Sequence, residues 1–573
     1  MKKYAKILLF GFIILVLVKL LLVLAISSPS IFSDEYYYSK LARSFFFNNA
    51  FSIHNELNTL YPPLYPIAIS SAYIFTDMKD VYLLMKLINV LLITSIIFPM
   101  YFLLKEFLSR KQAVVSSLVI SFLPVLFLMP IYIMAENLFY PLIIWAIFFL
   151  YKSQKEKSKL YPGLTGIAIG LCFLTKVLGI TLFLVPISLV ILNKFLKKQT
   201  LSFSKLAIIY IFALLIISPW IIFAGMENGF TLQGILGVYA KEATSLTRHS
   251  NFTLTFINWI FSYLAYIIAA IGIFPLGLWI TRKIPNEKKP LAYLLITAIS
   301  LFLLVVAYSS SGGPPDPVFS WFSGRPIGRY IEGIVPLALI LAYLLIESSQ
   351  KEFIKKKHIY ITSLVVSLTA AAFIAQLTLA SLFPANNISL TLLGVGKSIL
   401  GRLIYGSLSA NPYFSWLLFL TLSAIIVIIS SILIYIWALR KLNIKHLHLF
   451  FTAIFIITIF AGYAAIYYNT TTYWQNNEQL QLSEWINSNN KITDPKLLID
   501  EYYQGKLGKA SSALYERDGK YTSSIIGFWV NGEITIGNIQ QSDDFDYIIT
   551  KGKINKKLLR ETPSGIKLYT NEN

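Results

Sequence analysis

Apolar runs separated by short, lysine-rich loops make up most of the chain. Most of these runs are long enough for an α-helix to cross a bilayer, which takes about 17–25 residues. The first run, at residues 7–26, is not followed by a small-residue cleavage site, so we expect a retained helix rather than a removed signal peptide. The pattern predicts about thirteen transmembrane helices, at residues 7–26, 81–104, 112–130, 138–151, 161–176, 178–193, 204–223, 257–280, 291–309, 331–348, 359–382, 413–438 and 449–468.

The positive charges indicate how these helices are oriented. The chain has 49 Lys and Arg residues against 28 Asp and Glu residues, a net charge of +21. About half of the Lys and Arg residues fall at the N-terminus and in six short loops on one side, which is typical of cytoplasmic loops beside anionic lipid. The charge therefore favours the membrane, and no nucleic acid, as its partner. We expect a multi-pass protein of the cell membrane with a cytoplasmic N-terminus.

Two long segments are expected on the outer side, and the first is residues 27–80. Within it, residues 34–48 have apolar positions three and four apart, with Ser33 as the N-cap, which indicates a helix lying along the membrane interface. Residues 62–76 are apolar, short and rich in proline, which is typical of a re-entrant or partly embedded helix.

The second outer segment, residues 470–573, is polar and charged. It predicts a small extracytoplasmic α/β domain. One helix and three strands are expected there, at residues 475–488, 496–500, 546–550 and 566–569. The preceding residues, 1–469, are expected to form an all-α transmembrane domain. The single cysteine, Cys172, excludes a disulfide framework and a cysteine metal site.

Charged residues at the outer ends of the spans are the candidates for chemistry. Asp34 and Glu35 directly follow the first span, and Glu136 opens the fourth. Each carboxylate either offsets the positive end of a helix dipole or belongs to a site. Lys176, at the end of the fifth span, either extends to the headgroups or binds an anion.

Two arginines, Arg325 and Arg329, lie four residues apart at the outer start of the tenth span. Positive charge at a helix N-terminus opposes the helix dipole, so the pair requires an anion nearby. A phosphate suits the planar guanidinium group.

Five short motifs follow one another on the side expected to be outside. They are Asp34-Glu35 with Tyr38 and Ala42-Arg43, Pro62-Pro63-Leu64-Tyr65-Pro66, Glu136, Gly170-Leu171 with Leu174-Thr175-Lys176, and Arg329-Tyr330 before Pro336. Their order and topology resemble the GT-C superfamily of membrane glycosyltransferases. The closest resemblance is to the branch of lipid A aminoarabinose transferases and dolichyl-phosphate-mannose protein mannosyltransferases. One position departs, because relatives often carry Lys or His where this chain has Tyr61.

The resemblance implies a GT-C fold and inverting transfer of a monosaccharide from a polyprenyl- or dolichyl-phosphate donor. It implies that Asp34 is the base and that Glu35 and Glu136 orient the acceptor or the sugar. Phosphate is a good leaving group and needs no strong acid, whereas an acceptor hydroxyl needs a positioned base. The remaining candidates bind the donor phosphate (Lys176, Arg248, Arg325 and Arg329) or other parts of the substrate (His54, Tyr61 and Tyr330).

The resemblance leaves several points open. Some relatives use a divalent cation, but Asp34 with Glu136 is too sparse a ligand set to predict one, so no cofactor is required and any metal ligands stay unknown. The sugar, a hexose or a pentose, and the acceptor, a lipid, a protein or a glycan, are not fixed. The alternatives are a lipid-linked glycan transporter or flippase, which would place paired charges near the bilayer midplane, and a non-catalytic relative.

Overall fold

The chain divides into two compact units, each described here by itself. The first unit contains Met1–Lys19, Leu91–Met129 and Ala135–Ile466, and the second contains Leu20–Val90, Pro130–Met134 and Tyr467–Asn573. The computed structural model describes residues 2–30, 32–53, 56–59, 61–195, 201–231, 235, 252–271, 284–311, 327–347, 387–391, 444–489, 492, 494–500 and 520–571. Two expected spans, at residues 359–382 and 413–438, lie outside these ranges.

Apolar helices dominate the described residues and confirm a multi-pass membrane protein. Six helices are long and apolar enough to cross a membrane, and the pair Arg110–Ser121 and Pro124–Ile131, bent by 69°, makes a seventh if it forms one span. The total of thirteen spans stays a prediction. The six are Lys3–Leu24, Met78–Leu104, Val177–Phe195, Phe203–Asn228, Asn286–Ser310 and His448–Thr472. The helices of the apolar segments are α1 (Lys2–Leu24), α4 (Met78–Thr94), α5 (Ile97–Leu104), α6 (Arg110–Ser121), α7 (Pro124–Leu128), α8 (Glu136–Lys155), α9 (Leu160–Thr175), η3 (Val177–Ile180), α10 (Thr181–Phe195), α11 (Phe203–Asn228), α14 (Phe252–Ile271), α16 (Lys289–Ser310), α17 (Val335–Glu347) and α21 (Ile444–Asn469).

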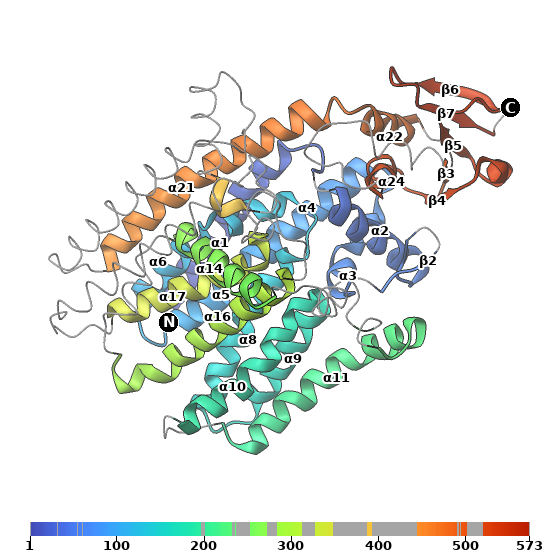
Figure 1. The fold of residues 1–573 in the computed structure, drawn as a ribbon. Helices are drawn as coiled ribbons and strands as arrows, with labels where there is room; N and C mark the ends of the chain where they lie inside the picture. Colours follow the sequence, from blue (N-terminus) through green and yellow to red (C-terminus); the bar gives the residue numbers. More distant parts are fainter. Residues whose placement is uncertain are drawn as a thin grey trace. The chain divides into compact units, whose positions relative to one another are not determined.

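Helix α9 packs against both α8 and α11 within the first unit (Figure 1). Two glycines of α9 allow the close approach to α11. A Cβ on Gly166 would lie 2.3 Å from Ile209 O, and one on Gly170 would lie 2.7 Å from Ile216 Cβ. Small residues four apart are typical of helix pairs in membranes, where close backbone approach provides van der Waals contact. This packing explains the glycine of the motif that ends at Lys176.

The proline just after α7 explains a charge inside the first span. Pro130 has no N–H, so it leaves Leu126 O without its ordinary helical donor. Lys19 Nζ donates to Leu126 O at 2.8 Å and to Thr94 Oγ1 at 3.2 Å. A transporter would be expected to pair such an intramembrane charge. Here the buried ammonium satisfies backbone and hydroxyl oxygens instead.

The second unit contains α2 (Phe32–Asn48), so the helix expected at residues 34–48 is present, and its place at the membrane interface stays a prediction. The prediction of Ser33 as its N-cap is wrong, because the helix already begins at Phe32. Glu35, in the first turn, reaches back and accepts a hydrogen bond from the N–H of Ser30, so a side chain inside the helix satisfies the preceding backbone. The rest of this segment is a hairpin and two short helices, β1 (Ser52–Ile53), β2 (Glu56–Leu57), α3 (Leu64–Ser70) and η1 (Ser71–Ile74).

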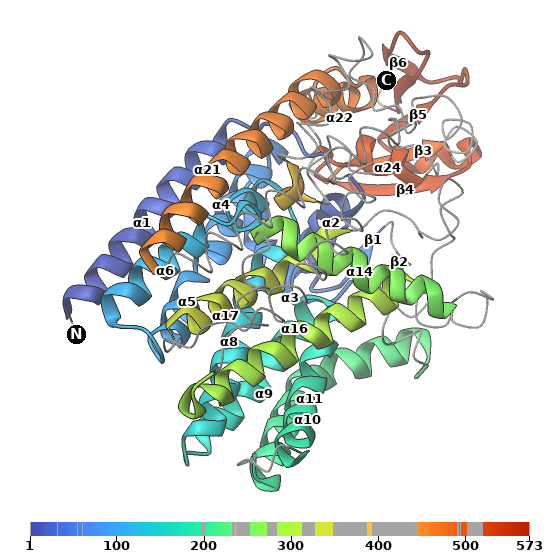
Figure 2. The same ribbon diagram turned by 60° about the vertical axis from the view of Figure 1, so that its left-hand side comes forward.

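The C-terminal segment of the second unit forms a five-stranded sheet in the order β4-β3-β5-β7-β6 (Figure 1), and Figure 2 shows β3, β4 and β5 of this sheet from another side. Strands β3, β4 and β5 are parallel, and β7 runs antiparallel to both β5 and β6. The expected helix and three strands are confirmed, whereas the sequence reading missed β4, β6 and α24. The elements are α22 (Glu478–Asn489), β3 (Lys496–Asp500), α24 (Lys520–Gly527), β4 (Glu533–Gly537), β5 (Tyr547–Thr550), β6 (Lys557–Glu561) and β7 (Lys567–Thr570).

Candidate active site

Asp34 lies in the first turn of α2 and is partly exposed. The hydroxyl of Tyr61 donates a hydrogen bond to Asp34 Oδ1 at 3.0 Å. The Tyr61 ring stacks on Tyr37, with centroids 5.4 Å apart, and meets Tyr38 edge-on at 5.1 Å. Burial, and then the negative charge of Asp34, raise the pKa of Tyr61 well above 10.0. The phenol therefore stays protonated and remains a donor to the carboxylate.

Glu35, the neighbour of Asp34, has a different environment, because its side chain is fully buried. Its Oε1 accepts a hydrogen bond from the backbone N–H of Ser30, and its Oε2 accepts one from the N–H of Ile133, each at 3.0 Å. The carboxylate thus joins the loop before α2 to the segment Pro130–Met134 of the same unit. Charge-assisted bonds to buried N–H groups hold the backbone in place.

Tyr65 of the proline-rich motif extends the aromatic group around the start of α2. Its ring meets Tyr38 edge-on, with centroids 5.0 Å apart. Its hydroxyl donates to Asn89 Oδ1 at 2.9 Å, and the Asn89 amide donates to Tyr132 O at 3.0 Å. Two of the expected motifs therefore meet in the second unit, where Tyr38, Tyr61 and Tyr65 form one aromatic group.

Lys86, in α4, lies at the end of α1. Its Nζ donates to Ile26 O at 2.5 Å and to Val23 O at 3.1 Å, and it lies 4.2 Å from the centroid of the Tyr82 ring. The last carbonyls of a helix have no intrahelical partner, and a cation near them offsets the negative end of the dipole. Lys86 therefore caps the C-terminal end of α1.

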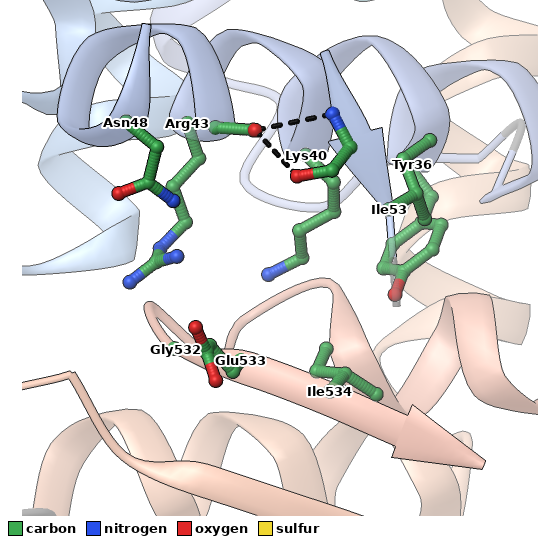
Figure 3. Close-up of a pocket in the computed structure, with 10 residues that line it drawn as sticks. Tyr36, Lys40, Arg43, Asn48, Ile53, Gly532, Glu533 and Ile534 are labelled. Atoms are coloured by element: carbon green, nitrogen blue, oxygen red, sulfur yellow. Dashed lines mark hydrogen bonds between the residues drawn. The ribbon is translucent and has the colours of Figure 1, made fainter. Parts of the chain in front are cut away.

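The C-terminal segment of the second unit holds α2 through two cations. Lys40 Nζ donates to Val530 O. Arg43 donates from Nε to Asn531 Oδ1 at 3.0 Å and forms an ion pair with Asp494. Figure 3 shows both side chains extending from α2 toward the turn that leads into β4. The Ala42-Arg43 part of the first motif is thus explained by the attachment of α2 to this segment.

Glu136 and Lys176 form a buried ion pair in the first unit. Glu136 is the first residue of α8, where a carboxylate also offsets the positive end of the helix dipole. Lys176 follows the last turn of α9, and its extended backbone, with φ −156° and ψ 133°, separates α9 from η3. The ends of two packed helices therefore place these opposite charges together.

Arg329 and Tyr330 lie beside this pair in η6 (Gly328–Tyr330). The Tyr330 ring centroid is 4.7 Å from Lys176 Nζ and 5.7 Å from Arg329 Cζ, so the two cations lie within about 10 Å of each other. The Tyr140 hydroxyl donates to Arg329 O at 2.8 Å and fixes the turn to α8. Both cations contact the same ring, as cation–π geometry allows.

Glu332 was not among the candidates, and the structure adds it to this group. It is fully buried in η7 (Glu332–Ile334), and its Oε1 accepts hydrogen bonds from the Tyr266 hydroxyl and from the N–H of Ser389, the latter at 2.9 Å. Its position three residues after Arg329 is the only sequence signal. Gly328 lies against the same tyrosine, because a Cβ there would be 2.1 Å from Tyr266 Cζ.

The candidates therefore gather within each unit. The second unit joins Asp34 to Tyr61, and the first joins Glu136, Lys176, Arg329 and Tyr330. The predicted residues His54, Arg248 and Arg325 lie outside the described part of the chain. Among the residues that are described, no three His, Cys, Asp or Glu side chains gather as a metal site.

Comparisons with known proteins show which family and which fold the chain is similar to. The family model described as dolichyl-phosphate-mannose-protein mannosyltransferase matches residues 61–223. The fold is similar to that of ArnT from Cupriavidus metallidurans in the apo state, with a TM-score of 0.58 and 13% identity over 99% of this chain and 98% of that one. The same protein bound to undecaprenyl phosphate gives a TM-score of 0.57 and 13% identity over 92% and 85%. No curated protein sequence matches.

The chain is therefore a multi-pass membrane protein whose fold is similar to that of ArnT. The matched family and the shared fold support a GT-C membrane glycosyltransferase, which confirms the resemblance seen in the sequence.

Proposed function

We propose that this protein transfers a monosaccharide from a polyprenyl- or dolichyl-phosphate donor to an acceptor hydroxyl on the outer face of the membrane. The acceptor oxygen attacks the anomeric carbon and the bond to the phosphate oxygen breaks, so the configuration inverts. The electron pair leaves with the phosphate, and the hydroxyl proton passes to Asp34. A phosphate leaves without a general acid, so one base is sufficient.

The observation that carries the choice of base is the contrast between two adjacent carboxylates. Asp34 is partly exposed and is held by the Tyr61 hydroxyl, so it retains access to a substrate. Glu35 is fully buried, and both its oxygens accept backbone N–H groups. A base must come within hydrogen-bond reach of the proton that it removes, which favours Asp34. Glu35 then acts as a positioning residue that fixes the start of α2.

The cations of the first unit supply charge for the leaving phosphate in this proposal. Lys176 and Arg329 share the Tyr330 ring, and the buried carboxylate of Glu136 orients Lys176. Preorganised positive groups at the developing phosphate charge lower the barrier without reorganising during the reaction. Arg325, Arg248 and His54 stay candidates for further contacts with the donor.

The test is Asp34→Asn in membranes supplied with polyprenyl-phosphate sugars. We expect sugar transfer to fall by at least about a hundredfold, since general base catalysis contributes roughly 10²–10⁴-fold. Asp80→Asn is the matched control, because Asp80 is an exposed carboxylate in the first turn of α4 and should be dispensable. Transfer at a near-normal rate by Asp34→Asn, in protein that is folded and inserted, refutes Asp34 as the base.

A further inference from the structure

A polar pocket lies between α2 and β4 in the second unit, and its lining residues have no role in the transfer reaction proposed above. The pocket has a cavity volume of about 40 Å³, and Lys40, Arg43 and Asn48 form one wall while Glu533 and Ile534 form the other. Figure 3 shows Lys40 and Arg43 extending from α2 across the gap toward Glu533.

The α2 wall presents hydrogen-bond donors in excess of its partners. Lys40 is 6% exposed and, among the described residues, donates only to Val530 O. Arg43 uses Nε for Asn531 and Nη2 for Asp494. An ammonium has three N–H donors and a guanidinium has five, so both cations retain donors for an additional group.

The opposite wall presents an acceptor. The Glu533 side chain is partly buried and, among the described residues, makes no hydrogen bond or ion pair. An ionised carboxylate only accepts hydrogen bonds. The ring of Tyr36 and the side chains of Ile53 and Ile534 add apolar surface, and Ser44 and Ser52, hydrogen-bonded to each other, also line the pocket. The pocket thus combines donors, an acceptor and an apolar surface.

We propose that this pocket binds a saccharide unit of the acceptor. A hydroxyl group both donates and accepts, so it can bridge the cations of α2 and the carboxylate of Glu533. The C–H face of a sugar ring fits an aromatic and aliphatic surface. An anionic ligand fits less well, because Glu533 would repel it and Asp494 already neutralises Arg43.

The position of the pocket indicates which part of the acceptor it binds. Lys40 and Arg43 follow Asp34 on the same helix by six and nine residues, which corresponds to about 9–14 Å along the axis. That separation exceeds one sugar ring. The pocket therefore binds a unit remote from the reacting hydroxyl, and it selects acceptors that already carry a glycan. This inference rests on the proposed transferase function.

The experiment measures saccharide binding separately from transfer. Full-length protein in nanodiscs is titrated with neutral tetrasaccharides of glucose, mannose, galactose and N-acetylglucosamine, and binding is followed by saturation-transfer NMR. We expect at least one to bind, and Glu533→Gln to weaken its binding about tenfold, because the amide replaces one acceptor oxygen by a donor. The matched control is Glu561→Gln, on β6 of the same sheet, which should bind as the wild type does.

The outcomes separate this proposal from the proposed function. Asp34→Asn should lose transfer and keep saccharide binding, so intact transfer by that variant counts against the base alone. Binding of none of the neutral tetrasaccharides overturns the pocket. A second result also overturns the proposal. If Glu533→Gln binds inorganic phosphate or glucuronate more tightly than the wild type does, and binds the neutral ligands unchanged, the pocket is an anion site.

Discussion

The buried ion pair between Glu136 and Lys176 makes a quantitative prediction about stability. The exposed fractions of the two side chains are 1% and 6%. Removing one partner of a buried pair leaves a charge without its counter-ion and typically costs about 3–5 kcal/mol. We therefore expect Glu136→Gln to lower the free energy of unfolding of the first unit by about that amount.

A second ion pair of the same unit supplies the control. Lys155 pairs with Glu106 at 2.9 Å, but the Lys155 side chain is 54% exposed, and such pairs contribute only about 0–1 kcal/mol. The assay is equilibrium unfolding of purified protein in mixed micelles, comparing Glu136→Gln with Lys155→Met. The double variant Glu136→Gln/Lys176→Met should lose less stability than the two single variants together, since neither charge then stays buried alone.

One result refutes this reasoning. If Glu136→Gln costs no more free energy than Lys155→Met, the carboxylate does not hold Lys176 in the embedded protein. In that case Glu136 is free to contact substrate directly. Binding of undecaprenyl phosphate distinguishes the two roles of Glu136. If Glu136 only positions Lys176, it acts on binding through that lysine, so Lys176→Met should weaken binding at least as much as Glu136→Gln does.

Two further predictions concern single side chains. Gly328→Ala should lower the free energy of unfolding by about 1–3 kcal/mol, because the new Cβ would overlap the Tyr266 ring. Gly163→Ala is the control, since the nearest atom to its new Cβ is 3.7 Å away and its stability should not change. Thermal unfolding of both variants measures the difference. Burial, and then Arg43, lower the pKa of Lys40 well below 10.5, so between the lowered pKa and 10.5 the unfolded chain binds more protons and stability rises with pH. Lys40→Met should flatten that rise in unfolding measured as the pH approaches 10.5, and an unchanged slope contradicts it.

The elements that the sequence predicted well are those that form clear apolar runs. The apolar spans follow from bilayer thickness, and β3 is predicted because Leu497, Leu498 and Ile499 form a short buried apolar run. The missed strands are the two edges of the sheet. Strand β6 has mostly exposed residues, including charged ones at both ends, as edge strands commonly do, so its sequence carries little apolar pattern.

The contacts that organise the site were beyond prediction for a different reason, namely their separation in sequence. Arg43 was visible as part of a motif, but its partners Asp494 and Asn531 lie more than 450 residues away. Lys86 belongs to none of the motifs, and the structure assigns it to the end of α1 through carbonyl groups some 60 residues earlier in the chain. Local patterns report which residues are unusual, and the tertiary partners decide what each one does.

Asp34 and Glu35 show this division most clearly. Both are acidic, both lie in the first turn of α2, and the helix dipole favours them equally. Successive residues of a helix point about 100° apart, so adjacent side chains meet different surroundings. Glu35 meets the N–H of Ile133, 98 residues away, and becomes buried, while Asp34 meets Tyr61 and stays accessible. The same charge therefore serves the backbone at one position and stays partly exposed beside a tyrosine hydroxyl at the next, and only the fold separates the two.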